Sequence, residues 1–114
     1  MVWYIITALV PLEYLGDVSD RDLVYLSGYF SQVREGLEQV DDEFTDTDVA
    51  RALDGEVGER TVSRVLHALD ESSADIIHNG GHIPGGVSMY EKNGYDPEMG
   101  DEIEQEIEQL RPEL

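Results

Sequence analysis

A helical pattern over residues 59–71 is the feature that most constrains how this chain can fold. Its apolar side chains recur at i, i+3, i+4 and i+7, which is the spacing of one face of an α-helix. These residues are Val62, Val65, Leu66 and Leu69. The helix therefore packs one face against a core and leaves the opposite face exposed.

The exposed face of this helix carries polar side chains at the same helical spacing. Arg60, Arg64 and His67 lie at i, i+4 and i+7, and Ser63 lies beside them. One side of the helix is thus expected to present two guanidiniums, a hydroxyl and an imidazole.

A shorter helix is predicted just before it. Thr45 is followed three residues later by Asp48, which is close to the capping box that starts many helices. Gly55 and Gly58 then break the helical pattern, as a sharp turn between two helices requires.

Two short runs with strand character follow the second helix. They cover residues 75–78 and 87–91, and they flank the sequence NGGHIPGG at 79–86. Its Asn-Gly step favours a hairpin turn, although the connection is longer than a two-residue turn. The chain from 45 to 92 is thus expected to form two helices followed by a β-hairpin with an extended loop.

This order resembles the winged helix-turn-helix transcription regulators. The resemblance rests on Thr61-Val62-Ser63-Arg64 with Leu66 and Leu69, followed by the hairpin at the expected distance. It implies that the chain binds double-stranded DNA, with helix 59–71 in the major groove and the wing 75–92 on the backbone or in the minor groove. The residues expected to contact DNA are Arg60, Thr61, Ser63, Arg64, His67, His78, Asn79, His82 and Lys92.

A structural role is the alternative for these residues. Arg60 and Arg64 could pair on the surface with Glu56, Glu59 or Asp70, and the three histidines could be ordinary exposed polar residues.

A long amphipathic helix is predicted over residues 19–41, and the resemblance makes it the scaffold on which the two shorter helices rest. Ser19 and Asp22 have the spacing of a helix start, and apolar residues then recur every three or four positions. Gly28 and Gly36 weaken the helix but allow another element to approach closely.

The two ends of the chain are predicted to supply a dimer interface. The segment 1–18 opens with an apolar stretch at 2–10, for which strand and helix remain equally open, and residues 97–114 form a last helix. The apolar side chains of each segment must be buried, either against the rest of its own chain or against a second copy. The interface residues expected in a homodimer are Trp3, Ile6, Met99, Ile103, Ile107 and Leu110.

Acidic residues dominate the composition. The net charge is -19 over 114 residues, and Lys92 is the only lysine. This composition resembles that of proteins from salt-loving archaea, where salt near 1 M shortens the screening length to about 3 Å. An acidic mesophilic protein, such as a mimic of DNA, is the alternative.

The acidic charge is distributed unevenly. Residues 48–92 carry eight acidic and four basic residues, a balance of -4, whereas the remainder carries 18 acidic and three basic residues, a balance of -15. Potassium or other cations taken up between carboxylates and phosphates could therefore accompany DNA binding.

The sequence offers little support for other classes of function. It has no cysteine, and its first 12 residues are too few to span a bilayer and lack a basic start, so a cytoplasmic protein without a membrane partner is expected. Asp75, His78 and His82 are separated by Asn-Gly-Gly, which suits a metal site poorly. No catalytic residues, metal ligands or cofactors are predicted, and an enzyme is not expected.

Together these patterns predict a mainly α-helical α+β fold, a single winged helix-turn-helix domain over residues 1–114 with extra terminal segments. The predicted function is sequence-specific regulation of transcription at high salt. The alternative is an acidic protein-interaction module or DNA mimic that does not bind DNA.

Overall fold

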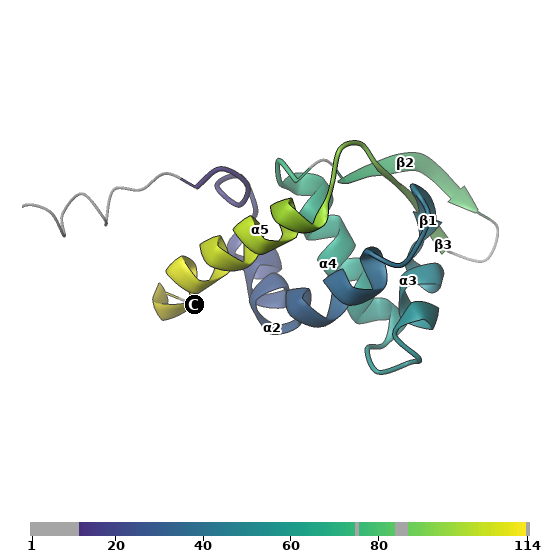
Figure 1. Cartoon of the computed structure of the whole chain (residues 1–114), viewed down its shortest axis with the longest axis horizontal. Helices are drawn as coiled ribbons and strands as arrows, with labels where there is room; N and C mark the ends of the chain where they lie inside the picture. The colour runs from purple at the N-terminus through teal and green to yellow at the C-terminus, as the bar shows by residue number, and fades with distance from the viewer. Residues whose placement is uncertain (1–11, 75, 84–86, 114) are drawn as a thin grey trace, which may run out of the picture.

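The computed structural model describes residues 12–74, 76–83 and 87–113, and in these it has the α+β composition expected from the sequence (Figure 1). Four α-helices accompany a three-stranded antiparallel sheet in the part described. In chain order the elements are α2 (Asp20–Leu37), β1 (Glu43–Thr45), α3 (Asp46–Ala52), α4 (Glu59–Glu71), β2 (Ile76–Ile83), β3 (Val87–Lys92), α5 (Pro97–Leu110) and a short 3-10 helix (Arg111–Glu113).

Helix α2 contacts three other helices, α3, α4 and α5. The side chain of Ser19 accepts a hydrogen bond from the backbone N–H of Asp22 at 3.4 Å and so caps the helix. Its apolar stripe, which includes Leu26, Phe30 and Val33, is fully buried. The helix ends at Leu37, a few residues before the predicted boundary.

One of the two glycines in α2 does allow a close approach. A Cβ atom added at Gly36 would lie 2.9 Å from the backbone oxygen of Val49 in α3, whereas one added at Gly28 would meet nothing within 4 Å. Gly36 is therefore the position at which α2 and α3 come together.

The two helices that follow agree with the sequence patterns. Thr45 and Asp48 form the predicted capping box at the start of α3. The turn after α3 places Asp54 and Gly55 at positive φ, and α4 covers the predicted residues 59–71. Its apolar stripe, from Val62 to Leu69, is completely buried.

The sheet differs from the predicted hairpin in two ways. Strand β2 continues through Ile83, so the prediction of a loop over residues 79–86 was wrong for residues 79–83. The register shifts between His78 and His82, where the two glycines fit an irregular strand. In addition β1, which the sequence did not predict, pairs with β3 and gives the order β1-β3-β2.

Helix α5 packs against α2 of its own chain. Ile103 and Ile107 are buried there, and Met99 and Leu110 pack partly buried against the same core. This packing accounts for the apolar spacing without a second subunit, so Ile103 and Ile107 are not exposed for the predicted dimer interface. Trp3, Ile6 and the rest of segment 2–10 lie outside the described residues.

A buried carboxylate joins α5 to the residues before α2. The side chain of Glu106 accepts hydrogen bonds from the backbone N–H groups of Glu13, Tyr14 and Leu15 at 3.0–3.2 Å. These contacts fix the start of the described chain on α5. None of the helices described is both long enough and apolar enough to cross a bilayer.

Candidate functional site

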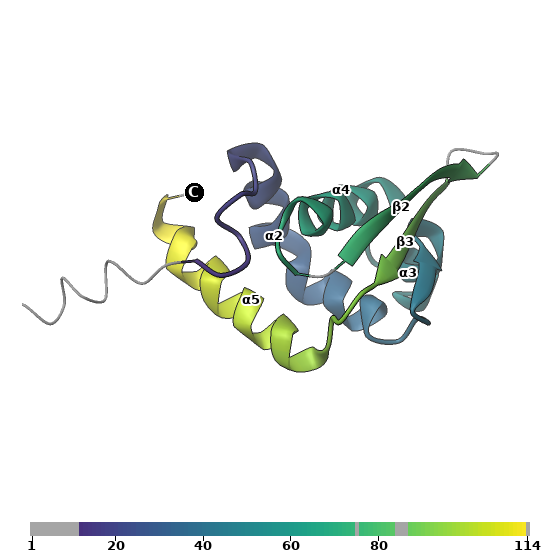
Figure 2. The ribbon, with the colours of Figure 1, turned by 90° about the horizontal axis from the view of Figure 1, so that it is seen from above.

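An open hollow of about 650 Å³ separates the polar face of α4 from the sheet. Figures 1 and 2 show α4 beside the β2–β3 hairpin, which extends away from the helical body. Helix α4 contributes most of one wall, and the two strands with the start of α3 contribute the other. The lining residues are Asp46, Glu59, Arg60, Ser63, Arg64, His67, Asp70, His78, Ser88 and Tyr90.

The two arginines of the hollow form no ion pair with the carboxylates that the structure describes. Among the described residues, none has a carboxylate oxygen within 4.0 Å of the Arg60 or Arg64 guanidinium. Arg60 is exposed, and the half-buried Arg64 lies 6.0 Å from the centre of the Tyr25 ring. The structure therefore does not have the alternative arrangement, in which Glu56, Glu59 or Asp70 forms an ion pair with one of these arginines.

Tyr90 forms the floor of the hollow between the helix and the sheet. Burial raises the pKa of its phenol to about 12, and the nearby charges of Asp46 and Asp70 act in the same direction. The neighbouring Ser63 hydroxyl on α4 lowers the pKa and so acts in the opposite direction. Ser63 and Tyr90 thus line the hollow from its helix side and its strand side.

His78 is fixed in position by both the helix and the sheet. Its backbone N–H donates to the Asp70 carboxylate at 2.9 Å, and its ring meets that of Tyr90 edge-on at 5.2 Å. The histidine therefore belongs to the wall of the hollow, and the same Asp70 carboxylate ties the end of α4 to β2.

Not all of the predicted DNA-contacting residues gather here. Thr61 is half-buried and does not line the hollow. The ammonium of Lys92 instead donates to the backbone oxygen of Val40 at 2.8 Å and lies 6.0 Å from the centre of the Phe44 ring. Loss of water around it lowers its pKa. Asn79 and His82 lie in β2, and only their backbone is described.

The predicted set also missed residues of the hollow. Ser88 and Tyr90 alternate along β3 and so point to one face, a signal that the sequence did contain. Asp46 also brings negative charge into the hollow, and only the folded chain reveals this, whereas Asp70 was already visible from its place on the same helix. Comparison with protein-family models, with curated proteins and with solved structures finds no significant match to this chain.

Proposed function

We propose that this chain is a DNA-binding transcription regulator of the winged helix-turn-helix type that works at high salt. In this proposal α4 enters the major groove and the β2–β3 hairpin is the wing that contacts the backbone or the minor groove. The order α2, β1, α3, α4, β2, β3 and the antiparallel hairpin beside α4 support this assignment.

The observation that carries the proposal is the state of Arg60 and Arg64. Both belong to one face of α4, both line the same open hollow, and no described carboxylate pairs with either. A guanidinium in this state can donate two parallel hydrogen bonds to a guanine edge or to a phosphate. Ser63 lies between them and offers a hydroxyl to the same ligand.

The acidic residues of the hollow determine the salt dependence that we expect. Glu59, Asp46 and Asp70 lie near the arginines, and each repels phosphate. Potassium ions taken up between these carboxylates and DNA would offset that repulsion. Ordinary DNA binding weakens steeply with salt because counterions are released, so here we expect binding to persist in molar KCl.

The test is binding to the DNA upstream of the chain's own gene in about 2 M KCl, where charges are screened within a few ångströms. The variant Arg60→Ala/Arg64→Ala should bind at least about tenfold more weakly, because each bidentate contact with a base contributes roughly 1–3 kcal/mol. The matched control is Arg21→Ala/Arg111→Ala, which removes the same charge from outside the hollow and should bind normally.

An equal loss of DNA affinity in both double variants would show that only the net charge matters. That result would contradict the proposed site. A folded wild type without selective binding at any salt concentration would favour the acidic interaction module or DNA mimic. A homodimer would further require two half-sites about one DNA turn apart, roughly 34 Å, which footprinting on the bound DNA measures.

A further inference from the structure

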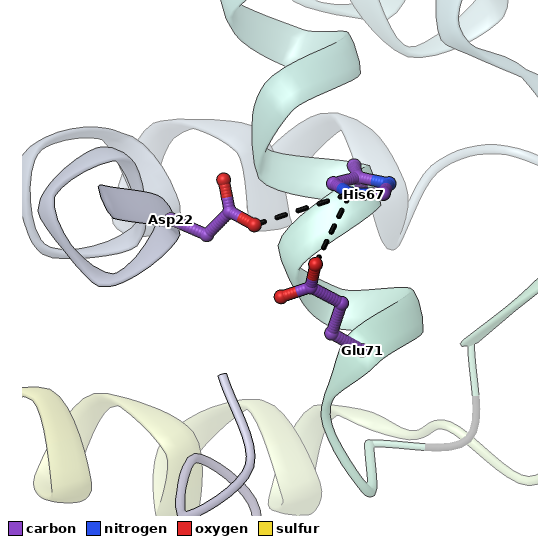
Figure 3. A group of neighbouring side chains, drawn as sticks. All are labelled: Asp22, His67 and Glu71. Atoms are coloured by element: carbon purple, nitrogen blue, oxygen red, sulfur yellow. Dashed lines mark ion pairs between the residues drawn. The ribbon is translucent and has the colours of Figure 1, made fainter. Parts of the chain in front are cut away.

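A second cluster of functional side chains lies where the start of α2 meets the end of α4. Figure 3 shows Asp22 of α2 and His67 and Glu71 of α4 pointing toward one another. The His67 Nε2 atom lies 3.1 Å from Glu71 Oε1 and 3.9 Å from Asp22 Oδ2. One ligand atom from each of the three residues can be chosen so that all lie within 4.8 Å of one another.

Asp22 is the unusual member of this cluster. Its side chain is only 7% exposed, and no hydrogen-bond donor among the described residues reaches its carboxylate. The His67 Nε2 atom, 3.9 Å from Asp22 Oδ2, is placed to pair with it when the imidazole is protonated. The carboxylate is directed toward the other two groups (Figure 3).

Glu71 is already oriented for a shared ligand. Its Oε2 atom accepts a long hydrogen bond of 3.5 Å from the backbone N–H of Ser19, and its Oε1 atom faces His67. His67 and Glu71 are four residues apart on one helix, the spacing that places two side chains on the same face. Contacts of this kind hold metal ligands in position in known sites.

We propose that Asp22, His67 and Glu71 bind a divalent first-row transition metal ion. One imidazole nitrogen and two carboxylate oxygens suit such an ion better than magnesium or calcium, which prefer oxygen ligands alone. Tetrahedral bonds of about 2.0–2.1 Å place ligand atoms roughly 3.3 Å apart. His67 and Glu71 nearly satisfy this spacing, and a small movement of Asp22 completes it.

The ion would link the start of α2 to the end of α4. Its two positive charges balance the two carboxylates, and water fills the remaining coordination position because His67 is 55% exposed. His67 also lines the hollow beside Arg64. Because His67 belongs to both the metal site and the hollow, metal binding should raise the affinity for DNA. This consequence, unlike the metal site itself, rests on the proposed function.

The test is a calorimetric titration of the full chain with ZnCl₂ in molar KCl, without DNA. We expect one zinc ion per chain and a melting temperature that rises on binding, because the ion binds only the folded state. The exposed position of His67 makes His67→Ala a variant that should fold, and it should bind zinc at least about tenfold more weakly. Co²⁺ should give a visible absorption band that the same variant lacks.

Matched controls separate this site from diffuse binding to an acidic surface. Glu71→Gln should abolish the high-affinity event, whereas Glu108→Gln, which removes an exposed carboxylate elsewhere, should not. His78→Ala should also retain it. Binding with a stoichiometry well above one, equal in wild type and His67→Ala, would overturn the proposal, as would zinc binding no tighter than that of Mg²⁺. Since no DNA is present, neither result depends on the proposed function.

Discussion

Arginines on two sides of the molecule lie in opposite electrostatic surroundings. Arg34 joins α2 to α5 and is only 12% exposed, with contacts of 2.9 Å to Glu38, Asp101 and Glu104. Arg60 and Arg64 on α4 have no such partner in the described chain. With 26 acidic and seven basic residues, partners are abundant everywhere. The difference shows that an excess of carboxylates does not force every guanidinium into an ion pair.

Close packing explains why Arg34 is held so firmly. Burial alone would lower the pKa of its guanidinium, but hydrogen bonds to Glu38 and Asp101 outweigh this effect and raise it. A Cβ atom added at Gly100 would lie 2.8 Å from the Arg34 guanidinium carbon and 2.6 Å from the Tyr95 hydroxyl. The first turn of α5 thus leaves a space that the guanidinium fills.

The largest expected difference in stability is between a variant that removes the paired Arg34 and one that removes Arg64, which forms no ion pair in the described chain. Arg34→Ala should lower the free energy of unfolding by about 3 kcal/mol, because it empties the space beside Gly100 and removes hydrogen bonds to three carboxylates. Arg64→Ala should change it by no more than about 0.5 kcal/mol. Denaturant unfolding in one fixed molar KCl buffer measures both. Similar values for the two variants would refute the distinction between them.

A smaller effect is expected where α2 meets α3. Gly36→Ala should cost roughly 2 kcal/mol, because the new methyl group collides with the backbone of Val49. Gly28→Ala in the same helix meets nothing and should instead add about 0.5–1 kcal/mol, because alanine favours the helix. Thermal unfolding of the two variants provides the measurement. A stabilising Gly36→Ala would show that the two helices are not in close contact.

The smallest expected effect on stability appears only at alkaline pH. Burial raises the pKa of Tyr90 to about 12 from an unfolded value of 10.0, so its contribution to stability is complete below pH 10 and is lost as the pH rises through 12. Tyr90→Phe should reduce the loss of stability across this window by on the order of 1 kcal/mol. Melting temperatures between pH 9 and pH 12 test this, and an unchanged slope in Tyr90→Phe would contradict it.

Much of the helical framework could be predicted because long periodic segments carry their own signal. The bounds of α4 followed from its apolar stripe and from Gly58 before it, and the capping box of α3 was visible as Thr45 and Asp48. The three residues of β1 are too few to show a period. The Asn-Gly step at 79–80 suggested a turn, yet the segment stays within β2, between His78 and His82, which both pair with β3.

The candidate site could be predicted only on its helical side. Arg60, Ser63, Arg64 and His67 share a face by spacing alone, and the hollow contains all four. Spacing also relates His67 to Glu71, but nothing in the sequence brings Asp22, far earlier in the chain, to the same point. Lys92 shows the opposite error. The sequence placed it in the site, but packing turns its ammonium toward the Val40 carbonyl.

The pairing of β1 with β3 has a consequence for the order of folding. It joins Phe44 to Tyr90, almost half the chain apart, whereas β2 and β3 are neighbours in sequence. Closing a long loop costs entropy that local helices and hairpins do not pay. We therefore expect β1 to pair with β3 after α4 and the hairpin have formed. Asp46 follows β1 directly, so the part of the hollow that it lines should be completed when β1 pairs.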